Sequence, residues 1–349
     1  MRTVPESRMV EIREKKPSYP VSDAFADYLK RYQRNDPVDV VYEDLRRFTQ
    51  SIPYETPDGE ESYWESVLYS PGETDEIHRE LTRIYAYMRT PEDPGFTEHL
   101  SIERVDFCRF GNSQPFRIKV VNKYNDVHDY YYVKHTDASR AYGLELEHIL
   151  APNRINFLVH ESTLIEEHIS GIPGDVFLEE RFPTDQRGLT RFAKEFVKFN
   201  ERCFVKLLGD MRAYNFVVVL TEDFDMRQFR IRAIDFDQQS FEGELKIYLA
   251  QFYPENKKAV DMVWKLLPQT TIRQYQREER SLIRRRLNVA RQRFDALMDC
   301  MCEDVLSTPD RVARLSAKLA RYHHDDSLAR VKGMGELTRR HMHKILETE

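Results

Sequence analysis

Three polar side chains stand at spacings that suit phosphoryl transfer. Asp210 lies five residues before Asn215, an apolar stretch follows at 216–220, and Asp235 comes twenty positions after Asn215. Phosphoryl transfer from ATP needs one carboxylate to orient or deprotonate the attacking hydroxyl, and an amide and a second carboxylate to hold magnesium on the phosphates. We therefore interpret Asp210 as the catalytic carboxylate, and Asn215 and Asp235 as magnesium ligands.

The same residues are also compatible with purely structural roles. An aspartate such as Asp210 often caps a helix, and Asn215 suits a turn. Asp237 is a candidate additional metal ligand, or it caps the next helix. Each feature alone is common, but the order Asp, Asn, apolar strand, turn and Ile-Asp-Phe-Asp favours the catalytic interpretation.

The segments 209–215 and 234–237 resemble the catalytic core of the protein-kinase-like superfamily. The Gly-Asp-x-x-x-x-Asn form is most similar to the aminoglycoside phosphotransferase and choline kinase branch. This resemblance covers roughly residues 101–260. It implies ATP and Mg²⁺ as cofactors and an unidentified hydroxyl-bearing small molecule as the acceptor. It also implies that Arg212 contacts the transferred phosphate, although a solvated loop arginine is the alternative.

The resemblance implies a two-lobed α+β fold with a five-stranded antiparallel N-lobe and a mainly helical C-lobe. Alternating patterns predict strands, and one amphipathic segment after the third predicts a helix, which is the order expected for such an N-lobe. The strands are expected at 105–110, 116–120, 130–134, 158–161 and 163–169, and the helix at 138–151.

Lys134 closes the third of these strands. In kinase-like folds this lysine contacts the nucleotide phosphates and pairs with a helix glutamate. Glu145 and Glu147 are the candidates for that glutamate, and Glu147 is slightly preferred because Leu144 and Leu150 flank it one turn away. A lysine at a strand end is otherwise simply solvated.

Two further parts of a nucleotide site follow from the resemblance. Residues around Glu167 and His168 are expected to form the hinge that hydrogen-bonds adenine, and Gly111 is expected to lie in the phosphate loop.

The phosphate loop holds one glycine, and Leu208 stands where the branch usually has histidine. These departures support a second hypothesis, a pseudokinase-like binding or scaffold protein. Protein kinase or nucleotidyl transferase activity on the same fold remains a third.

Helical periodicity predicts that the rest of the chain is mostly helical. We expect a helical N-terminal extension over 1–100, the N-lobe over 101–169, and a C-lobe with a helical extension over 170–349. Apolar steps of three or four residues predict helices at 23–31, 75–88, 189–200, 311–322 and 328–346, and one long helix over 280–305.

Composition limits the class of protein. Apolar residues make up 41% of the chain and charged residues 32%, which is typical of a globular protein. The N-terminus lacks an apolar signal core, and the four cysteines form no metal-binding pair, so we expect a cytoplasmic protein without a membrane span.

The C-terminal part of the chain is basic. Residues 257–349 contain 20 Lys and Arg against 13 Asp and Glu, and arginines crowd residues 273–293. This helix is either a solvated face or a site for an anionic partner. Nucleic acid is not expected, because Tyr275 is the one aromatic residue among these arginines, whereas binders of single strands stack successive bases on several aromatic side chains.

Overall fold

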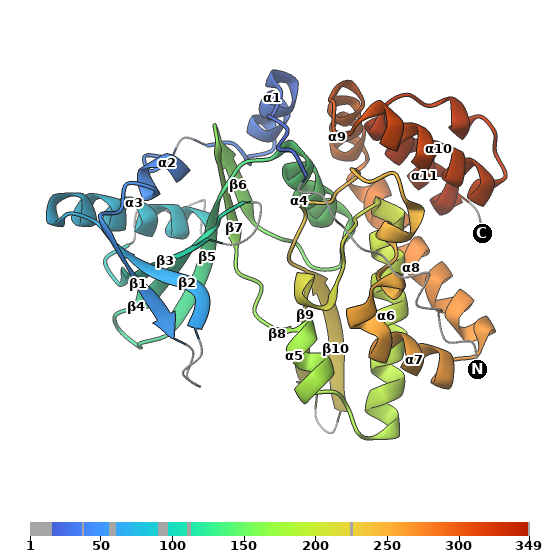
Figure 1. Cartoon of the computed structure of the whole chain (residues 1–349), viewed down its shortest axis with the longest axis horizontal. Coiled ribbons are helices and arrows are strands. Elements are labelled where there is room, and N and C mark those ends of the chain that lie inside the picture. The colour runs from blue at the N-terminus through green and yellow to red at the C-terminus, as the bar shows by residue number, and fades with distance from the viewer. Residues whose placement is uncertain are drawn as a thin grey trace. The chain divides into compact units, whose positions relative to one another are not determined.

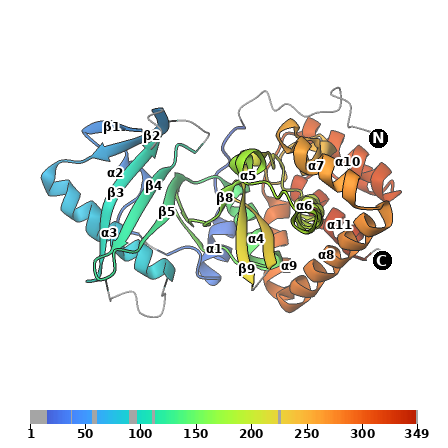
Figure 2. The ribbon, with the colours of Figure 1, turned by 90° about the horizontal axis from the view of Figure 1, so that it is seen from below.

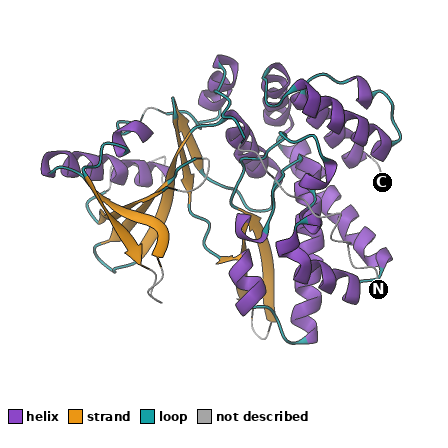
Figure 3. Cartoon of the chain, viewed as in Figure 1, coloured by secondary structure: helices purple, strands orange, loops and turns teal. Residues whose placement is uncertain are grey.

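The computed structural model describes residues 16–36, 38–55, 61–89, 97–109, 113–223 and 226–347. The chain divides into two compact units, which are treated separately below. The sheet unit comprises residues 20–137 and 155–168, and the helical unit comprises residues 1–19, 138–154 and 169–349. Strands dominate the first and helices the second (Figure 3). The predicted α+β class is confirmed.

An antiparallel sheet of seven strands forms the centre of the sheet unit, in the order β1-β2-β3-β4-β5-β7-β6. Its strands are β1 (Gln50–Glu55), β2 (Glu61–Leu68), β3 (Leu100–Cys108), β4 (Phe116–Asn122), β5 (His128–His135), β6 (Phe157–His160) and β7 (Thr163–Glu167). All five predicted strands are therefore present. The prediction of a helical segment over 1–100 and of a five-stranded sheet was wrong, because β1 and β2 extend the sheet from β3.

One face of this sheet is covered by helices. The sheet unit contains α1 (Asp23–Arg31), α2 (Tyr42–Leu45) and α3 (Pro71–Arg89), and α3 lies alongside β3 and β4 (Figure 2). The periodic residues Ile77, Leu81 and Ile84 of α3 are buried, as their spacing predicted.

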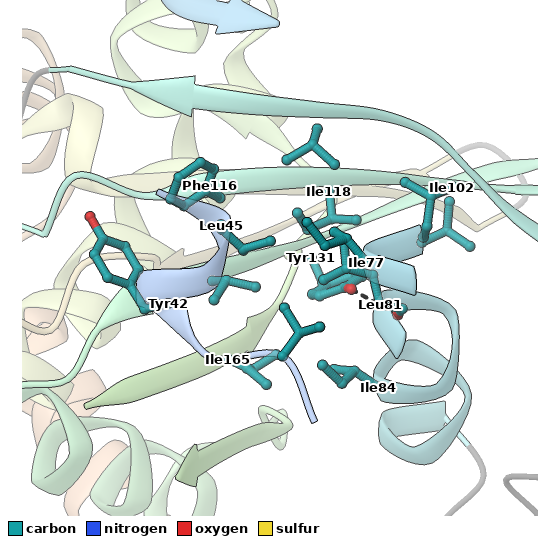
Figure 4. Packing of buried hydrophobic residues seen from close by; sticks show 14 of the residues in the cluster. Tyr42, Leu45, Ile77, Leu81, Ile84, Ile102, Phe116, Ile118, Tyr131 and Ile165 are labelled. Carbon is teal, nitrogen blue, oxygen red and sulfur yellow. Dashed lines mark hydrogen bonds between the residues drawn. The ribbon is translucent and has the colours of Figure 1, made fainter. Parts of the chain in front are cut away.

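A single apolar cluster joins these elements. Residues from α2, α3 and the strands meet in it, among them Leu45, Leu81 and the fully buried Phe116 and Ile118 (Figure 4). The Tyr131 hydroxyl donates a hydrogen bond of 2.8 Å to the Leu81 carbonyl oxygen, so this buried polar group has a partner. Burial of this kind contributes about 1.5–3 kcal/mol for each large side chain.

The helical unit contains most of the remaining elements. Its helices are α4 (Ala138–Leu150), α5 (Gly174–Glu180), α6 (Gln186–Lys206), α7 (Lys257–Leu266), α8 (Gln269–Val289), α9 (Arg291–Glu303), α10 (Pro309–His323) and α11 (Met334–Glu347). Short 3₁₀ turns are η2 (Ala213–Asn215), η3 (Leu245–Tyr248), η4 (Ala250–Phe252), η5 (Pro254–Asn256) and η6 (Leu328–Arg330). A small sheet of three strands has the order β10-β9-β8, with β8 at Ile172–Pro173, β9 at Phe216–Asp223 and β10 at Met226–Ala233.

Three predictions about these helices need correction. The long helix predicted over 280–305 is two helices, because Ala290 leaves helical geometry with φ −106° and ψ 27°. The last predicted helix begins at Met334, after η6. Helix α4, expected in the N-lobe, groups with the helical unit, where it contacts α8 and α9. No helix of the described residues is both long and apolar enough to cross a membrane.

Candidate functional site

Asp210 occupies a constrained turn between α6 and β9. Helix α6 ends with Leu207 in the left-handed region at φ 53°, and Asp210 has φ 58°. Its backbone N–H donates to the Tyr253 hydroxyl at 2.9 Å, and the N–H of Gly209 donates to the Gln238 carbonyl at 3.2 Å. Positive φ at a residue other than glycine is uncommon and persists where surrounding contacts enforce it.

Asn215 closes this turn with its side chain. Its Nδ2 donates to the Asp210 carbonyl oxygen at 2.7 Å, and its backbone N–H donates to the Arg212 carbonyl at 2.9 Å. With the amide nitrogen committed in this way, the side-chain oxygen is the atom suited to accept a ligand.

The hairpin of β9 and β10 returns the chain to the same place. Phe216 pairs with Ala233, and the Ile234 N–H donates to the Asn215 carbonyl oxygen at 3.0 Å. Figure 1 shows this hairpin beside α5 and α6. Asp235 therefore lies near Asp210 and Asn215, and its Oδ1 accepts the Asp237 N–H at 3.0 Å.

The carboxylate of Asp210 is mostly buried and is ion-paired. Arg212 Nε lies 2.7 Å from its Oδ1, and Arg212 Nη1 lies 3.6 Å from Glu255. Burial raises the pKa of Asp210 to about 6, and the negative charges of Asp235 and Glu255 act in the same direction. Arg212 acts against this rise but does not cancel it. A carboxyl with a pKa near 6 can change protonation state close to neutral pH.

Sequence reasoning missed the groups that support this turn. Asn256 donates from Nδ2 to the carbonyl oxygens of Met211 and Ala250 at 2.8 and 2.7 Å. Tyr253 and Asn256 come from more than forty residues away, so no local spacing identifies them. Gly174 had a weak signal as a turn glycine, and a Cβ there would collide with the Ala213 carbonyl and the Phe216 ring.

Asp237 has a structural partner. Its carboxylate forms an ion pair with Arg140 of α4, whose side chain is only 3% exposed. The residues after Asp237 form turns, and the next helical turn begins at Leu245, so Asp237 does not cap a helix. Helix α4 also packs closely on this segment, because a Cβ at Gly143 would lie 3.0 Å from Phe236 Cβ.

Lys134 has a different partner from the one predicted. Its Nζ lies 2.6 Å from Glu166 Oε2 within the sheet unit, and both side chains are largely buried. Glu166 follows Leu164, the cross-strand neighbour of Lys134, by two residues and therefore shares its face of the sheet. Sequence alone could not identify it, because the pairing register of β5 and β7 was unknown.

The two helix glutamates are also engaged elsewhere. Glu145 accepts two hydrogen bonds from Arg293, at 2.5 and 3.0 Å, and Glu147 forms an ion pair with Lys206. Both pairs lie within the helical unit. The expected pair between Lys134 and one of these glutamates is therefore replaced by three separate ion pairs.

The predicted hinge residues lie at the end of β7 and directly after it. The backbone N–H of Glu167 donates to the Asn156 carbonyl at 3.0 Å, and that of His168 donates to the Tyr130 carbonyl at 3.3 Å. Burial lowers the pKa of His168, whose Nδ1 lies 3.1 Å from the Tyr132 hydroxyl. Gly111, the candidate phosphate-loop residue, lies outside the described residues.

The arginine-rich segment 273–293 is partly used inside the protein. Arg280 pairs with Glu201 at 2.6 Å, Arg286 donates to the Leu150 carbonyl at 3.3 Å, and Arg293 pairs with Glu145. Arg273 and Arg277 are exposed on α8. The segment is thus neither wholly solvated nor wholly available to a partner.

The donor set around Asp210 includes two groups that suit magnesium. Across the described ranges, no three His, Cys, Asp or Glu side chains group as they do in an all-protein metal site. Magnesium usually takes only one or two carboxylates and completes its shell with phosphates and waters. Asp235 and the Asn215 side-chain oxygen are hard donors of that kind, so this pair fits such a site.

Neither a scan against protein-family models nor a search of curated proteins found a match to this chain.

Proposed function

We propose that this protein is an ATP- and Mg²⁺-dependent phosphotransferase that acts on a hydroxyl group. The observation that supports it best is the convergence of Asp210, Asn215 and Asp235 at one turn of the helical unit. The hydrogen bonds of Asn215 to Asp210 and of Ile234 to Asn215 hold three residues together that span 26 positions. The order of predicted strands and helix before them also agrees with a kinase-like arrangement.

Each of the three residues has a role in the proposal. Asn215 and Asp235 hold the metal, which supplies charge neutralisation on the transferring phosphate when bound. Asp210 accepts or orients the proton of the acceptor hydroxyl, and Arg212 keeps its carboxylate in one orientation. Lys134 as a phosphate contact stays a prediction of the sequence.

The raised pKa of Asp210 gives the proposal a pH signature. A general base must be unprotonated, so the rate should rise as pH increases through about 6. The same rise should be absent from the residual activity of Asp210→Asn.

The experiment is a phosphoryl-transfer assay with γ-labelled ATP and Mg²⁺ against a panel of small hydroxyl compounds. Asp210→Asn and Asp235→Asn should each lower the rate by roughly a thousandfold, because positioning and charge neutralisation supply most of the catalysis. Asp310→Asn is the matched control, since that carboxylate is 78% exposed on α10. Equal activity in all three variants would contradict the proposal.

A binding module without transfer activity is the second candidate. The close pair of Arg212 with Asp210 favours it, because an engaged carboxylate is less available to an acceptor. A thermal-shift titration with ATP, with and without Mg²⁺, separates the possibilities. A magnesium-dependent shift lost in Asp235→Asn, combined with no transfer to any acceptor, would support binding alone.

A further inference from the structure

A cavity of about 210 Å³ lies among α6, α7 and α8 of the helical unit. These three helices pack side by side (Figure 1). Asp210, Asn215 and Asp235 are not among the residues that line it. The cavity is therefore a separate feature from the proposed phosphotransfer site.

The cavity wall combines apolar and aromatic surface. Phe196 of α6, Val263 of α7 and Ile272 of α8 contribute apolar side chains. Trp264 also lines the cavity and is 54% exposed. A largely exposed tryptophan is unusual, because this side chain normally buries most of its area. This wall suits a ligand with a flat or apolar body.

Arg273 gives the cavity its charge. Within the part of the chain that the structure describes, its guanidinium has no ion pair and no hydrogen bond, unlike Arg280, Arg286 and Arg293. The lining contains no aspartate or glutamate, and its other polar side chains are amides such as Gln269. An unpaired guanidinium beside apolar surface is suited to a carboxylate.

Further positive charge lies nearby. The ammonium groups of Lys194 and Lys198 each lie 5.2 Å from the ring centroid of Tyr275, which places two lysines of α6 beside α8. Positive charge on these two helices favours the approach of anions to this part of the unit.

We propose that this cavity binds a small anion with an apolar body, of the size of a single-ring carboxylate. Arg273 contacts the carboxylate and Trp264 contacts the ring. The size argues against a larger ligand, because typical drug-sized sites occupy roughly 300–1,000 Å³. The site goes beyond the proposed phosphotransferase activity and requires neither ATP nor magnesium.

The test is a titration of the full chain with 3-phenylpropionate in the absence of ATP. Isothermal calorimetry and ligand-observed NMR measure the binding. The neutral 3-phenylpropionamide is the matched ligand control. Saturable binding of the acid is expected, with the amide at least about tenfold weaker because it lacks the charge-assisted contact. Arg273→Met should weaken binding of the acid by a similar factor and leave binding of the amide unchanged.

Arg277→Met is the matched protein control, since Arg277 is exposed one turn further along α8. It should bind the acid as wild type does. Trp264→Ala should weaken the acid and the amide alike, because it removes the contact with the ring. Three results would overturn the proposal: no saturable binding of the acid, equal affinity for the acid and the amide, or an equal loss of affinity for the acid in Arg273→Met and Arg277→Met. None of these results depends on phosphotransfer. A failure of the cavity proposal can therefore be distinguished from a failure of the proposed phosphotransferase activity.

Discussion

The interiors of the two units differ in how many charged groups they bury. The sheet unit is centred on an apolar cluster in which Phe116, Ile118 and Leu81 are fully buried. The helical unit also buries many apolar side chains, but more charged groups lie among them: Glu145, Glu201, Arg202 and Lys206 are each at most 5% exposed, whereas the sheet unit has Asp106 and Glu166. A buried charge needs a partner, whereas a buried methyl group needs only space. Substitutions in the two interiors should therefore fail for different reasons.

This contrast explains why the glutamates of α4 were misleading. A glutamate on the inward face of a helix behind a strand-end lysine resembles a catalytic pair. In the helical unit, however, buried carboxylates are common, and each of Glu145, Glu147 and Glu201 has a cation beside it. Their positions reflect the charged interior of this unit.

The largest expected effect comes from breaking a buried ion pair. Lys206→Met leaves Glu147 buried without its cation and should destabilise the helical unit by about 3–5 kcal/mol. The double variant Lys206→Met, Glu147→Leu should recover most of this loss, because no charge then remains unpaired. Denaturant unfolding gives the free energies. A double variant no more stable than the single one would contradict the interpretation.

Removing a buried side chain from the apolar cluster should lower the unfolding free energy slightly less than breaking the buried ion pair. Ile118→Ala removes a fully buried side chain and should destabilise the sheet unit by about 3 kcal/mol. Ile118→Val, which removes one methylene group, should cost about 1 kcal/mol. Hydrogen exchange measured by mass spectrometry should show faster exchange in β4 and β5 for Ile118→Ala, and in α4 and α6 for Lys206→Met. The same exchange pattern in both variants would show that the interiors do not respond separately.

The titration of Asp210 should change the unfolding free energy by a smaller amount that depends on pH. Its folded-state pKa of about 6 lies above the ordinary value of 3.8, so the folded protein holds this proton more tightly than the unfolded chain. The resulting stability is fully present below pH 3.8 and is lost as pH rises through 6. A shift of this size corresponds to at most about 3 kcal/mol.

Asp210→Asn removes this titration. The stability of the variant relative to wild type should therefore increase between pH 4.5 and pH 7.5, as measured by urea unfolding at both values. A difference that stays constant with pH would show that Asp210 ionises without cost in the folded protein.

The smallest effect is expected at an exposed ion pair. Arg340 and Glu336 of α11 are separated by 2.5 Å, but their side chains are 44% and 43% exposed. Arg340→Ala should change the unfolding free energy by about 0.5 kcal/mol or less, because solvent screens the pair. A loss comparable to that of Lys206→Met would remove the distinction between buried and exposed charges on which the comparison depends.

Local patterns in the sequence were sufficient for many elements. The alternation in 116–120 and 130–134 and the apolar steps in 75–88 predicted strands and a helix that the structure contains. The apolar strand after Asn215 was also predicted, and β9 lies there at Phe216–Asp223. Patterns over a few residues report the periodicity of the backbone, so they identify elements well.

Long-range pairing was not available from such patterns. The attachment of β1 and β2 to β3 and the register that joins Lys134 to Glu166 depend on residues far apart in sequence. The break at Ala290 could not be predicted either, because the apolar stripe continues through it.

The sequence by itself determined the five strands between residues 100 and 168, the helix among them, and the residue types that gather around Asp210. It established an aspartate, an asparagine and a second aspartate at spacings that one short hairpin can bring together. Tertiary structure alone decided which charges pair, which carboxylate is buried enough to hold a proton near pH 6, and which arginine is left beside a cavity. The physical reason is that residue spacing acts through the backbone, whereas charge pairing and desolvation depend on every element packed around a side chain.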